Sequence, residues 1–572
     1  MEKNEQLHNV RHSAAHLLAH AVQQLFPGTK KTIGPVTETG FFYDFQPLRN
    51  FKEEDLEIIE QRMRELSEKN YPIVGGQVPK EEARELFKDN PFKLELIDGI
   101  EGDTVGVYRQ EDFFDLCKGG HTKSTGQVKH FKLTGISGAY WRANRDGIPL
   151  QRITGIAFES KKDLDDYQQR LEDLKLYDHR VLGKQLDLFT FHDVAPGMPF
   201  FHNKGLVVFN KLIAHLRTFN STAYQEIRTP MIMNESLWRT SGHYDNYKEN
   251  MYFTSVEDTS FCVKPMNCPG SILVYQEKPH SYRELPLRLA EFGSVHRFEL
   301  SGSLHGMFRV RAFTQDDAHV YCTVDQIESE VSKMLDLAHK LYATFGFKDI
   351  KIGLSTRPAS TNLGTSDTWD QATTSLKNAL DNLGLKYVLQ EGDGAFYGPK
   401  IDLKLYDVLG REWQCGTIQV DFVQPLNFDL EYIDSDQSRK KPVIIHRALY
   451  GSIERFFGII LEHFKGHLPF WLAPIQVRIL TITDSQQEYA QEIYDRLIKS
   501  NIRAEIDRSG DQISAKIRKA QVEKLPWMLV VGQKEVDART VTLRTTDGKQ
   551  QFGITIDDIV ERAQTLDRDK TL

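Results

Sequence analysis

One charged segment divides this chain of 572 residues into parts of different character. Residues 161–176, KKDLDDYQQRLEDLKL, are rich in charge and carry leucines at helical spacing, which is typical of a solvated helix. Before this segment the sequence mixes a histidine-rich helical stretch with glycine-rich turns and short strands. After about residue 185, aromatic and apolar runs alternate with glycine and proline, as in the strands of a large sheet. The chain must therefore fold as several domains.

The composition shifts place four segments along the chain. We expect an N-terminal domain at 1–160, a linker helix at 161–184, a large domain at 185–473 and a C-terminal domain at 474–572. In the large domain the patterns predict strands at 307–313 and 412–422, and a helix at 325–345. The C-terminal segment alternates strand-like and helix-like stretches, which indicates an α/β unit with a mostly parallel sheet.

The composition is that of an ordinary globular protein, with 40% hydrophobic and 27% charged residues. Apolar stretches such as 526–532 are far shorter than the roughly 20 residues of a membrane helix. Residues 1–12 lack the apolar core of a signal peptide, so we expect a cytoplasmic protein with no membrane partner. Five scattered cysteines favour reduced thiols and metal ligands over a disulfide framework. With a net charge of −8, a nucleic acid would have to meet local patches.

The N-terminal helical stretch carries four histidines spaced four residues apart: His8, His12, His16 and His20. This spacing places side chains on one helical face. A second pair, Cys117 and His121, lies in the stretch DLCKGGH. Imidazole and thiol groups from two elements can converge on zinc or on a water nucleophile. Two such pairs favour a hydrolytic or metal site over purely structural histidines, with His8 and His20 as bystanders.

A second constellation is rich in arginine. Arg297 and Glu299 alternate in a stretch that we expect to be a strand, and Arg309 follows a loop on a returning strand. Ser452 and Arg455 lie near an expected helix start, where anions are favoured. Two arginines and a carboxylate on one sheet could hold a triphosphate and an adenine amino group. Since no stretch matches the P-loop pattern, bound ATP would lie on an antiparallel sheet.

A third set consists of Cys268, His319 and His446, which could ligate a metal. The three are far apart in sequence, so spacing alone is weak evidence. From the residues alone, a buried cysteine and two histidines with ordinary hydrogen bonds are the simpler explanation.

Taken together, these stretches resemble the bacterial type of threonyl-tRNA synthetase, a class II aminoacyl-tRNA synthetase. The shared motifs are TSGHYDNY, PMNCPG, RLAEFGSVHR, GSLHGMFRVRAFTQDDAH, AFYGPKID and the stretch around His446–Arg455. The resemblance implies an antiparallel β-sheet catalytic core, an α+β editing domain and a C-terminal α/β anticodon-binding domain. It also implies a homodimer with the stretch around Thr229 and Pro230 at its interface. The family's first, ubiquitin-like module is missing, so the sequence begins directly at the editing domain.

The resemblance carries functional roles onto the catalytic domain. One zinc ion per chain is expected on Cys268, His319 and His446, where it would bind the amino and hydroxyl groups of L-threonine. The arginines expected to hold the phosphates of ATP with Mg²⁺ and the substrate carboxylate are Arg297, Arg309 and Arg455. The residues expected to line the nucleotide are Glu299, Gln414 and Ser452. The expected threonine contacts are Gln315, Asp317, Tyr397 and Gln419, and His243 is expected to assist transfer to tRNA(Thr).

The resemblance also assigns an editing site and an anticodon site. The editing residues are His12, His16, Cys117 and His121, with Asp115 and Lys93 as further members and no tightly bound metal. Such a site is needed because serine has the hydroxyl of threonine and lacks only a methyl group, which is worth about 1–3 kcal/mol of discrimination. Glu535 and Arg544 match anticodon contacts. The chain departs from the family at Ser271, where histidine is usual, at Gly120, where proline is commoner, and at Gly510, where asparagine is usual.

Three other readings compete with an active editing synthetase. A non-catalytic paralogue that senses tRNA or amino acid would usually lose a motif arginine or a zinc ligand, and none is lost here. A free-standing deacylase would not need residues 185–572. A second, specialised or inhibitor-insensitive synthetase is suggested only by Ser271.

Overall fold

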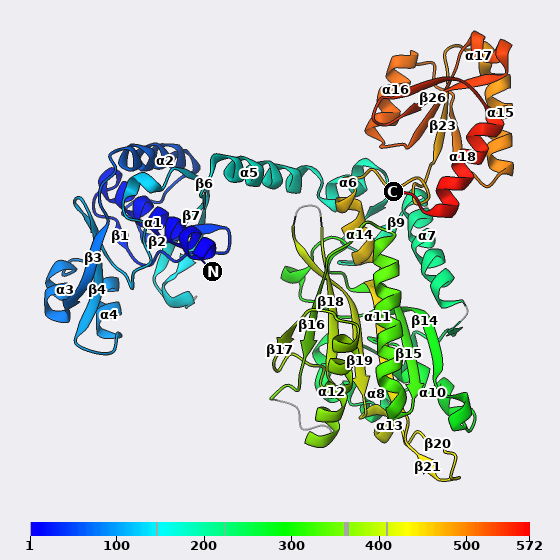
Figure 1. The fold of residues 1–572 in the computed structure, drawn as a ribbon, viewed down its shortest axis with the longest axis horizontal. Coiled ribbons are helices and arrows are strands. Elements are labelled where there is room, and N and C mark those ends of the chain that lie inside the picture. Colours follow the sequence, from blue (N-terminus) through cyan, green and yellow to red (C-terminus); the bar gives the residue numbers. More distant parts are fainter. Residues whose placement is uncertain (1, 145–146, 222, 360–364, 408–409) are drawn as a thin grey trace. The chain divides into compact units, whose positions relative to one another are not determined.

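The structure is a computed structural model that describes residues 2–144, 147–221, 223–359, 365–407 and 410–572 (Figure 1). The chain forms two compact units, residues 1–173 and residues 174–572. Within the described residues, no helix is both long enough and apolar enough to span a bilayer.

The first unit is built on a long helix, α1 (Glu2–Leu25), which packs against α2 (Glu53–Glu68) and a four-stranded sheet. In sheet order the strands are β1 (Lys30–Lys31), β2 (Gly40–Gln46), β7 (Pro149–Phe158) and β6 (His130–Tyr140). All their pairings are antiparallel. Ala14, Leu17 and Leu18 are fully buried, so the apolar face of α1 forms part of this unit's core.

A smaller antiparallel sheet completes the first unit. Its strands are β3 (Val74–Pro79), β4 (Thr104–Gln110) and β5 (Phe113–Leu116), and its helices are α3 (Lys80–Leu86) and α4 (Pro91–Asp98). Cys117 follows β5 directly, and its amide donates to the carbonyl of Gly106 at 2.9 Å. The predicted solvated helix is α5 (Lys161–Leu176), in which Leu164 is the one buried residue.

An eight-stranded sheet forms the core of the second unit (Figure 1). In sheet order its strands are β10 (Gln225–Glu226), β14 (Leu287–His296), β15 (Ala312–Cys322), β22 (Val443–Ser452), β19 (Glu412–Asp421), β18 (Lys400–Tyr406), β16 (Ile350–Ser355) and β17 (Tyr387–Gln390). The central pairings are antiparallel, and only the edge pairs β10–β14 and β16–β17 are parallel. The class II antiparallel core expected from the sequence is therefore confirmed.

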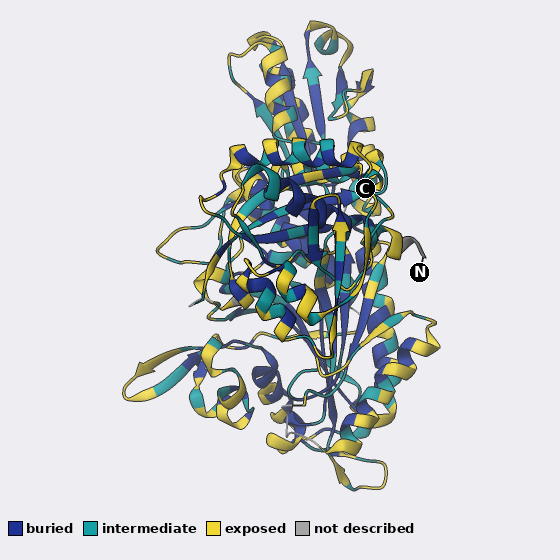
Figure 2. Cartoon of the chain, turned by 90° about the vertical axis from the view of Figure 1, so that its left-hand side faces the viewer, coloured by how far each residue is buried: buried dark blue, intermediate teal, exposed yellow. Residues whose placement is uncertain are grey.

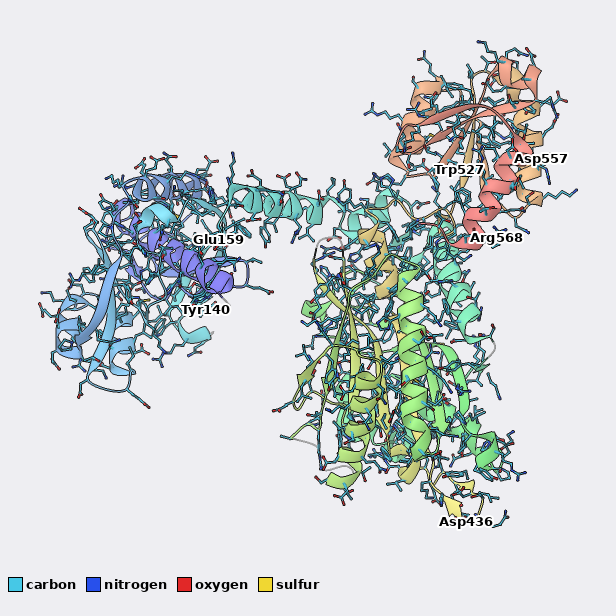
Figure 3. All side chains as sticks on the ribbon, viewed as in Figure 1. Tyr140, Glu159, Asp436, Trp527, Asp557 and Arg568 are labelled. Carbon is cyan, nitrogen blue, oxygen red and sulfur yellow. The ribbon has the colours of Figure 1, made fainter. Side chains whose placement is uncertain are left out.

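Helices α11 (Ile327–Ala343), α12 (Ser366–Asn382) and α14 (Ile453–His463) pack on this sheet. Figure 2 shows the interior of the unit as mostly buried. The other elements of the large domain include α6 (His179–Gln185), α7 (Asn203–Asn220), α8 (Glu235–Thr240), α9 (His243–Tyr247), α10 (Cys268–Gln276), α13 (Gln424–Asn427) and a small sheet of β11 (Ile232–Asn234), β12 (Tyr252–Val256) and β13 (Thr259–Val263). Asp436 lies at the tip of the hairpin of β20 (Tyr432–Ile433) and β21 (Arg439–Lys440) (Figure 3).

Two predicted strand assignments around the arginines are wrong. Strand β14 ends at His296, so Arg297 and Glu299 lie just beyond it. Residues 306–308 form a turn before β15 begins at Ala312, and Arg309 closes this turn by an isolated antiparallel bridge to His305. The apolar run MFRVRAF resembles a strand because Met307 and Phe308 are buried, but they are buried as turn residues.

The C-terminal part of the second unit contains a five-stranded sheet whose strands are, in sheet order, β24 (Ala504–Asp507), β23 (Val477–Thr481), β25 (Trp527–Val531), β26 (Thr540–Thr545) and β27 (Gln550–Thr555). The helices α15 (Gln487–Lys499), α16 (Ile513–Val522), α17 (Gln533–Ala538) and α18 (Ile556–Asp569) accompany it. Only β23, β24 and β25 are parallel. Strands β26 and β27 are antiparallel because a short turn with Gly548 at φ 85° joins them. The C-terminal sheet, which we expect from the sequence to be mostly parallel, is thus parallel only among β23, β24 and β25.

Candidate active and editing sites

A cavity of about 230 Å³ opens at the large sheet and gathers most of the predicted nucleotide-binding residues. The predicted residues that line it are Arg297, Glu299, Arg309, Gln315, Gln414, Ser452 and Arg455. They come from the end of β14, the turn before β15, strands β15 and β19, and the start of α14. The antiparallel register brings Gln315 of β15 opposite Ser452 of β22.

The cavity is strongly cationic. Nε of Arg297 donates to the carbonyl of Pro265 at 3.1 Å, and its guanidinium lies 5.1 Å from the ring centroid of Phe313. Burial, together with the nearby charges of Arg309 and Arg297, lowers the pKa of Arg455. Three guanidinium groups that line one cavity form a site for a multiply charged anion.

The start of α14 contributes a second anion-binding feature to this cavity. Ser452 is the N-cap of the helix, and its Oγ accepts a hydrogen bond from the amide of Arg455 at 3.1 Å. Helix N-termini favour anions because their first amides point outward. The prediction that Ser452 and Arg455 lie at a helix start is confirmed.

The three predicted metal ligands, Cys268, His319 and His446, come together in the same unit. Their ligand atoms lie within 4.8 Å of one another, and all three residues are buried. His319 and His446 are cross-strand neighbours on β15 and β22, and Cys268 is the first residue of α10. Of the described residues, none forms a hydrogen bond with Nε2 of His319, which is buried. A buried nitrogen without a hydrogen bond, beside a thiol and an imidazole, offers donor types that zinc accepts, so the three residues are a candidate metal site.

Acidic and amide groups surround the metal-ligating residues. Nε2 of His446 lies 2.9 Å from Oδ2 of Asp421, whose Oδ1 accepts the amides of Val423 and Gln424. Oδ2 of Asp317 accepts from Nδ2 of Asn267 at 3.2 Å. Burial raises the pKa of Asp317 to about 6. A negative group is thus placed beside the ligands, where it can meet a substrate ammonium.

The remaining predicted substrate residues lie around the same ligands. The hydroxyl of Tyr397 donates to Oε1 of Gln419, and the ring of Tyr397 lies 5.2 Å from that of His446. His243 is fully buried, with Nδ1 2.7 Å from Oγ of Ser241 and Nε2 3.7 Å from Sγ of Cys268. His243 therefore lies next to the metal-ligating set. Ser271, the departure from the family pattern, is buried with Oγ 3.0 Å from the hydroxyl of Tyr321.

The four predicted editing side chains, His12, His16, Cys117 and His121, form a compact cluster in the first unit. Their ligand atoms also lie within 4.8 Å of one another. The rings of His12 and His121 stack at 4.2 Å, and Sγ of Cys117 lies 3.1 Å from Nε2 of His121. His20 instead bonds Asp112 at 2.7 Å and stacks on Phe113, as befits a structural residue.

The protonation of this cluster follows from its hydrogen bonds. Nδ1 of His12 lies 3.2 Å from the carbonyl of Gly120, which can only accept, so Nδ1 carries the proton. Its Nε2 therefore has a free lone pair, which faces Sγ of Cys117 at 3.3 Å. Burial raises the pKa of Cys117 to about 11, so the thiol stays protonated, and Sγ donates to the carbonyl of Gly119 at 3.7 Å. Gly120 has φ 83°, which proline cannot adopt, so this loop differs locally from one with proline there.

Burial keeps the histidines of the cluster neutral. It lowers the pKa of His16 to about 3 and that of His121 to about 2, and it lowers the pKa of His12 as well. Neutral imidazoles at neutral pH can accept a proton from water. The cluster can therefore act as a general base.

A buried ion pair lies next to the histidines of the cluster. Lys93 and Asp115 are both 2% exposed and pair directly. Burial alone would raise the pKa of Asp115, but Lys93, His16 and Lys31 together lower it to about 2. The hydroxyl of Tyr43 donates to Oδ2 of Asp115 and lies 3.2 Å from Nζ of Lys93.

Sequence reasoning missed Tyr43 and Asp421. Tyr43 lies in the aromatic strand GFFYDFQ, which reads as core, and no spacing rule distinguishes it from its neighbours. Asp421 is the last residue of β19, and it meets His446 only through the register of β19 with β22. An acidic residue at the end of a hydrophobic strand is a weak signal that could have drawn attention to Asp421.

The two predicted anticodon residues lie in the C-terminal sheet region. Oε2 of Glu535 accepts the amide of Gly532 at 3.0 Å, and Oε1 accepts from Oγ1 of Thr542 at 2.9 Å. Glu535 thus caps the start of α17 with Oε2 and connects the helix to β26 with Oε1. Arg544 is half-buried on β26, opposite Met528 of β25.

Three parts of the chain match known domain families. Residues 105–154 match the second additional domain of threonyl and alanyl tRNA synthetases. Residues 252–464 match the tRNA synthetase class II core domain (G, H, P, S and T), and residues 476–566 match the anticodon binding domain.

Whole-chain relatives and a solved structure agree with this division. A threonine–tRNA ligase of Clostridium botulinum (strain Okra / Type B1) is 50% identical over 566 residues, covering 98% of this chain and 89% of the relative. One of Acetivibrio thermocellus is 50% identical over 556 residues, covering 96% of this chain and 87% of the relative. The crystal structure of the RNA binding domain of threonyl-tRNA synthetase from Cryptosporidium parvum Iowa II has a TM-score of 0.66 at 44% identity and covers 68% of this chain and 98% of that one.

Proposed function

Because this chain belongs to the threonine–tRNA ligases, we propose that Cys268, His319 and His446 hold one zinc ion that selects threonine. The enzyme uses ATP with Mg²⁺ to activate L-threonine and joins it to tRNA, and its N-terminal domain is of the editing type. What remains to be assigned is which side chain performs which step.

The proposal for zinc is supported by the donor set. One thiol and two imidazoles leave a fourth coordination position, as in catalytic zinc sites. Nε2 of His319 has no hydrogen bond among the described residues, and the ion would complete it. When bound, zinc would supply Lewis-acid positions for the amino and hydroxyl groups of the substrate. Asp317, 3.8 Å from Nε2 of His319, would orient the ammonium, and Asp421 would hold His446.

We assign ATP to the cationic cavity. The carboxylate of threonine attacks the α-phosphate, and pyrophosphate leaves, so negative charge builds on the phosphate oxygens. Arg297, Arg309 and Arg455 are placed to meet this charge, because all three line one cavity. Ser452 caps the helix that presents Arg455, and Gln414 lies on the neighbouring strand of the sheet. Strand β15 carries both Gln315 of the cavity and His319, and β22 carries both Ser452 of the cavity and His446. This shared placement is the observation that carries the assignment.

We assign the hydrolysis of Ser-tRNA to the histidine cluster of the first unit. A zinc ion that requires a β-hydroxyl rejects valine, but serine can satisfy it. The free lone pair of Nε2 of His12 would take a proton from the attacking water. Asp115 lies 4.0 Å from Nε2 of His16, pairs with Lys93 and accepts from Tyr43, and would keep His16 in place. Synthesis and hydrolysis would thus be performed by different units.

We also propose an oligomeric state and a cellular location for the enzyme. A homodimer is favoured by the exposed Met231 and Ile232, which directly follow Thr229 and Pro230 and are 45% and 55% exposed. We place the enzyme in the cytoplasm, where tRNA is charged.

Pyrophosphate exchange with threonine, serine and valine tests the synthetic half of the proposal. We expect efficient exchange with threonine, weaker exchange with serine and almost none with valine. Equal exchange with valine and threonine would show that no hydroxyl-requiring group selects the substrate. A time course with preformed Ser-tRNA tests the editing half.

A further inference from the structure

A buried histidine outside the assigned sites connects two elements of the ATP cavity. His179 is the first residue of α6 and is fully buried. The amide of Met307 donates to its Nε2 at 2.9 Å, and its Nδ1 lies 2.7 Å from Oε1 of Glu462. Because an amide can only donate, Nε2 must offer its lone pair and Nδ1 must carry the proton. The ring is therefore neutral and in one tautomer.

The carboxylate that receives this proton is itself fixed. Glu462 lies in the last turn of α14 and also accepts the amide of His179 at 2.9 Å and a hydrogen bond from Arg411. Nε of Arg411 donates to Oδ2 of Asp407 at 2.7 Å, and Nε1 of Trp413 donates to the same oxygen at 3.0 Å.

Asp178, His179 and Glu462 lie close enough together to resemble a metal site. Their hydrogen bonds argue against one. Asp178 accepts three hydrogen bonds from Arg180, and both ring nitrogens of His179 are already bonded. Asp178, His179 and Glu462 therefore form a hydrogen-bonded network.

The turn that His179 holds is the turn that carries Arg309. The ring of Phe308 lies 4.1 Å from that of His179 and 4.1 Å from that of Trp413. The carbonyl of Phe308 accepts from Nε of Arg455 at 2.8 Å. A Cβ at Gly306 would come within 2.1 Å of Nε2 of His179, so the close approach requires glycine.

We propose that His179 is a positioning residue for the ATP site. It fixes the turn bearing Arg309 to the end of α14, the helix whose first turn presents Arg455. Two arginines from different elements are thereby held at one separation, which matters because catalysis by fixed charges depends on their preorganisation. The inference rests on the proposed roles of Arg309 and Arg455 in binding ATP.

Two substitutions at His179 distinguish the roles of its two ring nitrogens. In His179→Gln the amide oxygen can stand in for Nε2 and accept from Met307, whereas in His179→Asn the shorter amide can stand in only for Nδ1. We expect His179→Asn to raise the KM for ATP in threonine-dependent pyrophosphate exchange about tenfold, the scale of one lost hydrogen bond at a preorganised site. In His179→Gln we expect the KM for ATP to remain within about threefold of the wild-type value. We expect the KM for threonine to change little in both variants.

Gly306→Ala provides an independent variant, because its methyl group would push the turn away from His179. We expect the same rise in the KM for ATP. His339→Gln is the matched control, since the bond of His339 is to the carbonyl of Leu335 in its own helix, and it should behave as wild type. Thermal melts identify variants that have lost their fold.

The outcomes distinguish this inference from the assignment on which it rests. If Arg309→Ala leaves exchange intact, the assignment of ATP to the cavity fails. Suppose that Arg309→Ala is impaired, but that the His179→Asn and Gly306→Ala variants fold and keep the wild-type KM for ATP. The positioning role is then overturned. Equal losses in the Asn and Gln variants, in proportion to lower melting temperatures, would show a structural role alone and would also overturn it.

Discussion

His319 and His446 face each other across strands β15 and β22, with ring centroids 4.9 Å apart. They are separated by more than a hundred residues of sequence, and the antiparallel register alone makes them neighbours. Cys268, at the start of α10, completes the set. The three proposed ligands therefore lie on rigid elements, which would suit a site that discriminates between similar amino acids.

Replacing Cys268 by alanine should remove the metal. The variant would keep two imidazole ligands and lose its thiolate, and we expect it to lose both zinc and threonine-dependent pyrophosphate exchange. Elemental analysis with the exchange assay measures both. Cys262→Ala is the control, because Cys262 is equally buried but lies in a separate apolar cluster. Full zinc content and normal exchange in Cys268→Ala would falsify the ligand assignment.

Arg297→Ala and Arg455→Ala should each reduce adenylate formation at least about 100-fold, the usual scale for removing one donor that stabilises developing charge. Pyrophosphate exchange at saturating threonine measures this. Arg239→Ala serves as control, since Arg239 is half-exposed and pairs with Glu235 on its own helix. Near-normal exchange in either cavity variant contradicts the class II assignment of these arginines.

The editing cluster should be separable from synthesis. The double change of His12 and His16 to alanine, or Cys117→Ala, should leave Thr-tRNA synthesis nearly intact and abolish hydrolysis of preformed Ser-tRNA. The reason is that the cluster lies in the first unit and the arginines in the second. His8→Ala is the matched control on the same helix. Hydrolysis by the variants at the wild-type rate would place the editing site elsewhere.

The pH dependence of hydrolysis should be displaced to the acid side. Burial lowers the pKa of His12 below its ordinary value near 6.5, and it lowers those of His16 and His121 to about 3 and about 2. More than half of His12 is therefore in the neutral, base-competent form at pH 6.5, and this form is lost as the pH falls further. Enzyme-dependent Ser-tRNA hydrolysis, corrected for the spontaneous rate, should keep more than half of its pH 7.5 rate at pH 6.5. A midpoint at or above pH 7 would contradict the neutral cluster.

Arg544→Ala should raise the KM for tRNA and leave pyrophosphate exchange unchanged. Arg544 is half-buried on β26, whereas the residues of the ATP cavity lie on the large sheet and its helices. Glu535→Gln should instead lower stability, because both oxygens of Glu535 hold α17 and its surroundings. Aminoacylation kinetics with varied tRNA, alongside exchange and thermal melts, separate these effects. An exchange defect in Arg544→Ala would indicate misfolding and not lost anticodon contact.

Local patterns predicted individual elements well and their connections less well. The charged helix α5 and the helix start at Ser452 were predicted because each depends on residues a few positions apart. The alternation of apolar residues with Arg309 and Arg311 predicts a strand, but Arg309 closes a turn at 306–308 by an isolated bridge to His305. The strands β26 and β27 form a hairpin that the expected parallel pattern did not include.

By itself, the sequence determined the family, because the family's motifs are contiguous and their residues are read directly. The resemblance to that family also predicts which side chains bind zinc and ATP. Only the tertiary structure decided which distant residues meet. Asp421 reaches His446, and Tyr43 reaches Asp115, through pairings and packing between remote segments. Similarly, His179 gains its role from Met307 and Glu462. Spacing along a chain fixes the faces of one element, whereas contact between elements follows from the register and burial of the whole fold.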